Sequence, residues 1–430
     1  MKLLRSANSH RIRKNNEIIA AIDIGDSKIS CFVAKVITDG DAPLEAEVIG
    51  VGHYRAPTRQ GGRISAHEME MSLRNAVESA ERMAQMRIQN VHVAIPGKYL
   101  RTRRIGVDIE TAGGLITQED VDDCIAEGAK IAAADGNVAL HAIPTMFQID
   151  GEDAFAEPVG LSGGILSVEM LGVAARQSTL DNLSALIERA GLTVQEFVAA
   201  PLASAEAVLI SDEKDLGVVL IDIGSGSTDF AVYDAGVMID CGAVRVGAGH
   251  ITKDIAQIFG APLAQAERTK NLHGAALIGP GDEHRLIEFT QLGVVGEKVR
   301  ASRADLCEVI IPRMEEILEL IGDQLPDDNL TRSGLRRAVI TGAGSLLVGA
   351  REITERTLAM KTRIGRPMSL AGAPEAACSP GFSVCSGVIH HSINSDTEPN
   401  SSLGVSGQSL QEFPQAAFLG GVEAWFRAKF

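Results

Sequence analysis

The sequence has few aromatic residues, no paired cysteine motif and no long apolar run. Trp, Tyr and Phe make up only 4% of its 430 residues. Its six cysteines (31, 124, 241, 307, 378 and 385) form no CxxC pair and no CxxH spacing, which excludes the common zinc and redox-dithiol motifs and predicts reduced, mostly buried thiols. No stretch of 18 apolar residues occurs, so we expect no membrane-spanning helix.

The chain also has fewer basic residues than acidic residues. The chain has 40 Lys and Arg residues against 56 Asp and Glu residues, a net charge of −16. Because proteins bind nucleic acids by neutralising phosphates, we expect no nucleic-acid partner. A basic arm at residues 1–17 is not followed by the apolar run of a secretory signal, so we expect a cytoplasmic protein. With 45% hydrophobic residues, the composition is that of a globular protein of several domains.

What the sequence does contain is a repeat. Two apolar strands end in Asp-Ile-Gly about 200 residues apart, in AAIDIGDSK at 20–28 and VLIDIGSGSTD at 219–229. A turn and another apolar strand follow each of them, which predicts two equivalent hairpins and an internal duplication at domain scale. A third glycine turn follows a strand and precedes a helix in AVITGAGSLLVGARE at 338–352.

Apolar periodicity predicts further helices and strands between these turns. The segment 98–170 has a strand, a helix capped by Thr117 and two more strands, which indicates an inserted β-α-β-β module. We also expect a helix at 66–86, a strand at 91–97, a helix at 178–190, a strand at 193–200 followed by a helix, a mainly helical stretch at 250–328 and a buried terminal helix within 381–393.

Glycine turns with small hydroxyl residues suit the binding of an anion. Without side chains in the way, several backbone N–H groups can converge on one phosphate, and two facing turns would clamp it. The acidic residue that begins each turn, Asp23 or Asp222, would hold Mg²⁺ through coordinated water. A single such turn is more often an ordinary hairpin, but two copies and a third glycine turn favour the phosphate site.

These motifs resemble those of a known superfamily. AIDIGDSK, IDIGSGSTD and VITGAGSLLVG are similar to the first phosphate, second phosphate and adenosine motifs of the actin, DnaK-chaperone and sugar-kinase superfamily. Their order and spacing are most similar to the FtsA family of bacterial cell-division proteins, from Ile18 to Phe430. Four stretches add to the resemblance: VAIPGKYL at 93–100, TQEDVDDCIAEG at 117–128, LHAIPTMFQID followed by PVGLSGG at 158–164, and LIERAGLTV at 186–194.

The resemblance implies an α/β actin-like fold of duplicated ribonuclease-H-like domains. It also implies an inserted β-α-β-β subdomain and a C-terminal amphipathic helix on a flexible linker. The expected units are a basic arm (1–17), a first half (18–97, 171–200 and 370–393), an inserted subdomain (98–170), a second half (201–249 and 329–369), a helical subdomain (250–328), a linker (394–416) and a tail helix (417–430).

The resemblance also implies an ATP site with Mg²⁺ held by Asp23 and Asp222. The residues expected to line it are Asp23, Gly25, Asp26, Ser27 and Lys28 on one side of the phosphates, Asp222, Gly224, Ser225, Gly226 and Ser227 on the other, and Gly342, Ala343, Gly344 and Ser345 by the adenosine. Ala343 departs from the commoner Gly. Glu267 and Lys270, three apart on one helix face, would embrace the ribose and adenine; a surface ion pair is an equal alternative.

Hydrolysis needs a group that orients the attacking water. Relatives often place Glu just before the Pro of the segment that links the two halves, and Ala200 stands there in this chain. Glu206, six residues on, is expected to be out of reach. We therefore predict tight nucleotide binding with slow or no turnover.

The last thirteen residues carry the only Trp and form an apolar stripe at helical spacing. The stripe and its basic neighbours are Phe418, Leu419, Val422, Trp425, Phe426, Arg427, Lys429 and Phe430. Such a tail is typical of an interfacial helix that inserts among anionic lipid headgroups. A tail helix that docks on its own domain is the alternative.

The family resemblance implies a function for the whole chain. It implies filaments on the inner face of the cytoplasmic membrane at the division septum, with the tail anchoring the FtsZ ring. The segment 250–328 is expected to bind the C-terminal peptide of FtsZ, and the inserted subdomain to serve filament contacts and later division proteins. Two alternatives share the ATP motifs: a sugar or acetate kinase, which needs an acidic base in the cleft, and a pilus-assembly actin-like protein, which lacks this aromatic C-terminus.

Overall fold

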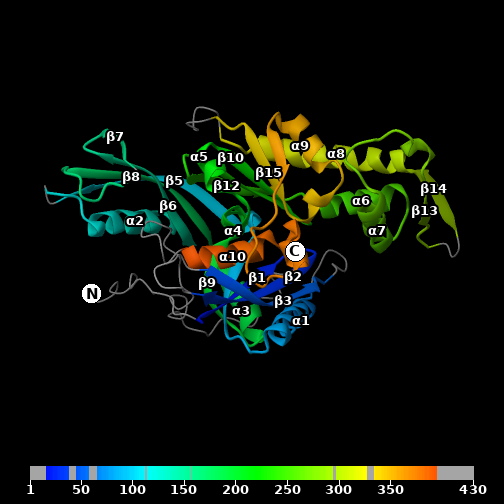
Figure 1. The fold of residues 1–430 in the computed structure, drawn as a ribbon, viewed down its shortest axis with the longest axis horizontal. Coiled ribbons are helices and arrows are strands. Elements are labelled where there is room, and N and C mark those ends of the chain that lie inside the picture. Colours follow the sequence, from blue (N-terminus) through cyan, green and yellow to red (C-terminus); the bar gives the residue numbers. More distant parts are fainter. Residues whose placement is uncertain are drawn as a thin grey trace.

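The computed structural model describes residues 16–37, 45–57, 65–111, 114–155, 157–293, 297–326 and 334–394. Two five-stranded sheets with the same strand order form its centre (Figure 1). The first runs β3 (Glu45–Arg55), β2 (Lys28–Ile37), β1 (Ile18–Ile24), β4 (Asn90–Ile95) and β9 (Thr193–Ala199). The second runs β12 (Val237–Val244), β11 (Thr228–Asp234), β10 (Val218–Ile223), β15 (Arg337–Thr341) and β16 (Lys361–Ile364). The predicted duplication is confirmed.

In both sheets an antiparallel hairpin is extended by parallel strands. Strand β1 pairs antiparallel with β2 and parallel with β4, while β10 pairs antiparallel with β11 and parallel with β15. Asp23 pairs with Ser30 one residue before β1 ends, and Asp222 pairs with Asp229 one residue before β10 ends. The two Asp-Ile-Gly turns therefore occupy equivalent corners of two related sheets.

Helices α1 (Ala66–Ala84) and α3 (Gln177–Arg189) cover the outer face of the first sheet. Leu73 and Ala76 of α1 lie in one buried cluster with Ile22 and Val93 of the strands. Because apolar residues recur every three or four positions, one face of α1 is buried and the other meets solvent, as the sequence pattern predicted.

Two further helices lie between the sheets, α4 (Ala200–Val208) and α10 (Ser383–Asn394) (Figure 1). Helix α10 contacts β1 and β2 of the first sheet, and α4 contacts β10 and β11 of the second. The two helices cross at Gly387, where a methyl group would lie 1.7 Å from the carbonyl oxygen of Ala203. This close crossing joins the halves directly beneath the glycine turns. A short helix, α5 (Ser211–Asp215), follows α4.

The inserted subdomain lies at one end of the molecule (Figure 1). It comprises β5 (Leu100–Glu110), α2 (Gln118–Ala132), β6 (Asn137–Ile149), β7 (Glu152–Phe155) and β8 (Ile165–Arg176), in the sheet order β5-β8-β6-β7. Thr117 caps α2 reciprocally with Asp120, as predicted. The short strand β7 is an addition to the expected β-α-β-β pattern.

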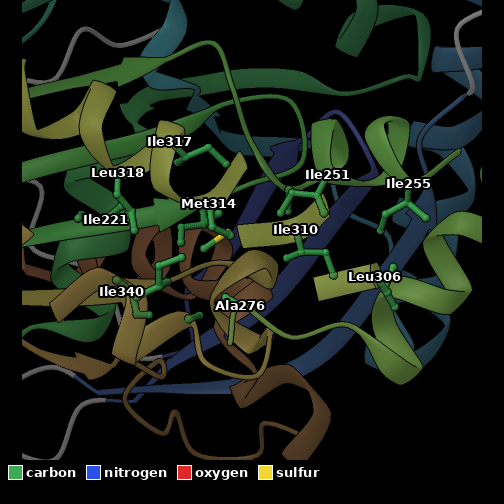
Figure 2. Close-up of a cluster of buried hydrophobic side chains, with 14 of the residues drawn as sticks. Ile221, Ile251, Ile255, Ala276, Leu306, Ile310, Met314, Ile317, Leu318 and Ile340 are labelled. Carbon is green, nitrogen blue, oxygen red and sulfur yellow. The ribbon is translucent and has the colours of Figure 1, made fainter. Parts of the chain in front are cut away.

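The opposite end carries α6 (Ala248–Ile258), α7 (Leu263–His273) and α8 (Arg303–Gly322). Figure 2 shows side chains of α6 and α8 gathered with Ile221 and Ile340 of the second sheet in one buried cluster. The prediction of a mainly helical stretch was incomplete, because a hairpin of β13 (Leu286–Thr290) and β14 (Lys298–Ser302) lies there too. Ile287 and Phe289 of β13 are buried between exposed neighbours, but each strand has only five residues, and segments this short are ambiguous between helix and strand. Helix α9 (Ala350–Leu358) follows β15.

Several remaining expectations concern single residues and the tail. All six cysteines are free and five are buried, as predicted. Among the described residues, no helix is both long and apolar enough to cross a bilayer. The basic arm at 1–15, most of the linker and the whole tail from 417 lie outside the described residues.

The α4–α10 crossing leads to a test of stability. We expect Gly387→Ala to lower the free energy of unfolding by about 3 kcal/mol or more, because the added methyl group meets rigid backbone rather than a movable side chain. Urea unfolding followed by circular dichroism measures this loss. The matched control is Gly106→Ala in β5, where a methyl group would meet nothing within 4 Å. Equal stability of the two variants would contradict the packing at Gly387.

Candidate functional site

The two Asp-Ile-Gly turns touch each other across the two halves. A methyl group at Gly226 would lie 2.1 Å from Oδ2 of Asp26, so the side chain of the first turn packs against the backbone of the second. Gly224 and Ser225 accept backbone hydrogen bonds from the start of α6, from Ala248 N and Gly249 N, both at 2.9 Å. The N-terminus of α6 therefore holds the second turn in place through Gly224 and Ser225, while Gly226 of the same turn faces Asp26.

The third glycine turn packs against the same corner. Gly342 has a φ of +78°, and a methyl group there would lie 2.2 Å from Oδ1 of Asp222. Only glycine combines this backbone conformation with such a close approach. Gly344 is similarly confined by Ile223, and Ser345 donates its hydroxyl hydrogen to Gly342 O at 2.7 Å. The structure thus brings all three predicted turns together.

Two partly buried carboxyl groups begin the phosphate turns. Burial raises the pKa of Asp23 to about 6, against the opposing charge of Lys28. Burial also raises the pKa of Asp222, whose Oδ2 accepts a hydrogen bond from Ser204 Oγ of α4 at 2.6 Å. Both groups therefore lie where a charge is costly unless a cation accompanies it.

Lys28 is held between the first turn and the segment that leads into α10. Its Nζ lies 3.3 Å from the centre of the Phe382 ring, a cation–π contact. A methyl group at Gly381 would lie 3.2 Å from the same Nζ and 3.5 Å from Cβ of Ala343. Burial lowers the pKa of Lys28, and Asp23 opposes that shift. Gly381 therefore lies beside both Lys28 of the first turn and Ala343 of the adenosine turn.

The structure adds two residues that the sequence analysis missed. Lys98 Nζ forms a 2.6 Å ion pair with Asp26 Oδ2, and Asp229 Oδ2 accepts a hydrogen bond from Gly97 N at 2.7 Å. Burial raises the pKa of Asp229 to about 7, and this carboxyl lies opposite Asp222 in the β10–β11 ladder. The ladder position was a signal for Asp229, because a strand residue paired with a site residue lies beside it.

The acidic composition of the site fits a divalent cation. Four carboxyl groups (Asp23, Asp26, Asp222 and Asp229) are grouped with two ammonium groups (Lys28 and Lys98), so negative charge is in excess. Carboxylate oxygens that are not balanced by ammonium groups suit a divalent cation such as Mg²⁺. Within the described ranges, no three acidic, His or Cys side chains are arranged to ligate a metal directly. Magnesium held by Asp23 and Asp222 through its waters stays a prediction.

Glu267 and Lys270 form an ion pair on α7 that is not a simple surface pair. Their Nζ–Oε2 distance is 2.8 Å, and the Lys270 side chain is only 8% exposed against 45% for Glu267. Lys270 Nζ also donates to Thr252 Oγ1 at 2.8 Å and to Ala248 O at 3.1 Å, so it ties α7 to α6. A role for the pair at the ribose and adenine stays a prediction.

The start of α4 lacks an acidic side chain. Ala200 is buried there, and Glu206 Oε1 lies 3.0 Å from His391 Nδ1 of α10. Glu206 is therefore directed at the neighbouring helix, in agreement with the expectation that it does not reach the glycine turns.

Comparisons with known proteins decide the family. The model described as "Cell division protein FtsA" matches residues 219–387, and the model of the SHS2 domain inserted in FtsA matches residues 97–174. FtsA of Agrobacterium fabrum is 31% identical over 400 residues, which are 91% of this chain and 90% of that protein. This chain belongs to the FtsA family. The family match favours the cell-division interpretation over a kinase or a pilus-assembly protein.

Solved structures show that the fold is actin-like. The PilM–PilN type IV pilus biogenesis complex aligns with a TM-score of 0.58 at 16% identity, covering 89% of this chain and 99% of the other. MreB5 of Spiroplasma citri bound to AMPPNP aligns with a TM-score of 0.51 at 12% identity, covering 89% and 98%. At these identities the likeness concerns the fold alone. The predicted FtsA resemblance and fold class are confirmed.

The raised pKa of Asp229 predicts a pH dependence of stability. Between pH 4 and pH 7 the folded protein keeps the Asp229 proton that the unfolded chain loses, so wild-type stability falls as pH rises. We expect Asp229→Asn to gain stability over wild type across this window by about 1.4 kcal/mol per pH unit, with no further gain above pH 7. Urea unfolding of chelator-treated, nucleotide-free protein at several pH values measures it.

The control for this experiment is Asp108→Asn, an exposed position on β5. We expect the difference between that variant and wild type to stay constant with pH. A constant difference for Asp229→Asn as well would overturn the assignment of a buried, protonated carboxyl.

Proposed function

We propose that this chain is an ATP- and Mg²⁺-binding cell-division protein that polymerises on the inner face of the cytoplasmic membrane at the septum and anchors the FtsZ ring there. Membership of the FtsA family supports the cell-division role. The observation that carries nucleotide binding is the contact between Asp26 and Gly226, which places two duplicated glycine turns around one acidic site. The same fold in MreB5 of Spiroplasma citri is bound to AMPPNP.

Each part of the site has a proposed task. The glycine turns offer backbone N–H groups to the phosphates, and Lys28 supplies a positive charge beside the first turn. Asp23 and Asp222 accept hydrogen bonds from the waters of the metal. When bound, Mg²⁺ supplies the positive charge that the four carboxyl groups lack. Gly342, Ala343 and Gly344 leave room for the adenosine.

We propose that turnover is slow. Ala200 cannot orient a water molecule, and Glu206 pairs with His391. Asp222 is engaged by Ser204 on the side of α4. The nucleotide would then act mainly as a stabiliser of the closed arrangement of the two halves, with hydrolysis as a rare event.

For the FtsZ peptide we propose the groove between α6 and α8. It has a volume of about 630 Å³, and its lining includes the apolar residues Ile258, Phe259, Val309 and Pro312. Ile258 is 62% exposed and lies in one groove with Phe259, Val309 and Pro312, a surface that a partner could cover. Arg313 in the same lining already pairs with Asp254 at 2.7 Å. Apolar side chains of the peptide would therefore contribute most of the affinity.

The C-terminal tail would supply the membrane contact. One short amphipathic helix binds lipid weakly, because it folds on binding and buries only part of its surface. Protomers aligned in a filament present many tails at once, so avidity couples assembly to attachment. We propose that the inserted subdomain supplies filament contacts and a surface for later division proteins.

Nucleotide binding can be tested at the contact between the turns. We expect Gly226→Ala to weaken MgATP binding at least about tenfold, because its methyl group displaces Asp26 and narrows the site. Titration with a fluorescent ATP analogue measures the affinity, with Gly106→Ala as control. Wild-type affinity in the Gly226 variant would contradict the proposed position of the phosphates.

Membrane attachment can be tested by vesicle flotation. We expect Trp425→Glu to reduce flotation with anionic vesicles about tenfold or more, because it removes a large apolar side chain from the stripe and adds a charge. Ala424→Glu adds the same charge on the opposite side of the helical wheel and should float nearly as wild type. Unchanged flotation of the Trp425 variant would remove the tail from the mechanism.

A further inference from the structure

The first residues of the inserted subdomain lie inside the candidate nucleotide site. Strand β4 of the first half is joined to β5 of the inserted subdomain by a single 3₁₀ turn, Gly97–Tyr99. Gly97 N donates to Asp229 of the second half, and Lys98 Nζ pairs with Asp26 of the first phosphate turn. Arg245 Nη2 of the second half donates to Lys98 O at 3.0 Å. This hinge therefore contacts both halves at the point where they meet.

The Lys98 ammonium faces the acidic groups of the site rather than solvent. Its side chain is only 10% exposed, and that of Asp26 is 13% exposed. Its positive charge also acts on Asp23 and Asp229, favouring their ionised forms against the effect of burial. Lys98 is thus central to the charge balance of the site and is more than one half of a surface ion pair.

Asp26 occupies the place where the two turns come closest. Because its carboxylate packs on Gly226, a phosphate held between the turns would compete with it for the same ammonium group. A lysine ammonium has three donors on a flexible stem, so it can turn from a carboxylate to a phosphate by rotating side-chain bonds.

We propose that Lys98 is a further phosphate-binding residue, which turns from Asp26 toward the terminal phosphate and thereby sets the position of the inserted subdomain. The inference rests on the proposed nucleotide binding. Leu100, two residues after Lys98, begins an unbroken antiparallel ladder between β5 and β8 that extends to Glu110. A movement of the Gly97–Tyr99 turn would therefore move the β5–β8 sheet of the inserted subdomain.

The proposal distinguishes a triphosphate from a diphosphate. Removing the ammonium with Lys98→Met keeps the length of the side chain, and we expect it to weaken MgATP binding about tenfold or more while MgADP binding changes less. Calorimetric titration of the full chain measures both affinities. The control is Lys130→Met on α2 of the same subdomain, where the lysine pairs with the neighbouring Glu127 and is 61% exposed; it should bind both nucleotides as wild type does.

Repeating the Lys98→Met substitution in a protein that already lacks the Asp26 carboxylate separates phosphate binding from a purely structural ion pair. In Asp26→Asn protein the carboxylate partner is gone, so a purely structural role predicts that Lys98→Met then has no effect on ATP affinity. Our proposal predicts that Lys98→Met still weakens ATP binding in that background. If the Asp26→Asn variant and the Asp26→Asn, Lys98→Met double variant bind ATP with equal affinity, the proposal is overturned.

Hydrogen exchange gives a second readout, measured in wild-type protein and in Lys98→Met. We expect exchange across 100–110 in wild-type protein to differ between the MgATP and MgADP states, and this difference to disappear in Lys98→Met. An identical pattern in both nucleotides would overturn the coupling to the inserted subdomain. Wild-type protein that binds neither nucleotide would instead refute the proposed function itself.

Discussion

The main constraint on this structure is the grouping of four carboxyl groups at the junction of two duplicated sheets. Asp23 and Asp222 end equivalent strands, and the glycines that follow allow the two corners to come into contact. Burial raises the pKa of both carboxyl groups, so the site is poorly balanced without additional positive charge. This imbalance supports the proposed binding of a metal ion, and the glycine turns support the proposed binding of phosphates.

The rest of the fold holds this junction in place. Helices α4 and α10 cross without intervening side chains at Gly387, and α4 also supplies Ser204 to Asp222. On the far side of the same crossing, His391 of α10 pairs with Glu206 of α4. One helix pair therefore positions a site carboxyl group and engages the acidic residue that could otherwise have faced the cleft. The proposed binding geometry and the proposed slow turnover would then have a common structural origin.

The sequence predicted what is local or repeated and missed what depends on distant contacts. The duplication was visible because Asp-Ile-Gly recurs after two apolar strands, and the α2 cap was visible because Thr117 and Asp120 are three residues apart. Lys98 was missed because its partner Asp26 is 72 residues away, and Gly97 reaches Asp229 across 132 residues. The β13–β14 hairpin was missed because each strand has only five residues, and such short segments are ambiguous between helix and strand. The family resemblance supplied the nucleotide roles, which no local pattern could specify.

The position of the inserted subdomain gives the proposed nucleotide site a use that does not depend on hydrolysis. An enzyme needs a group that acts on the reacting atoms, whereas an assembly protein needs only a difference in shape between two states. Here the hinge Gly97–Tyr99 is bonded to both halves of the site, and the subdomain that follows it extends to one end of the molecule. A small change in how Lys98 balances the acidic cluster would be amplified along β5. Surfaces far from the site could therefore respond to its occupancy while the nucleotide stays intact.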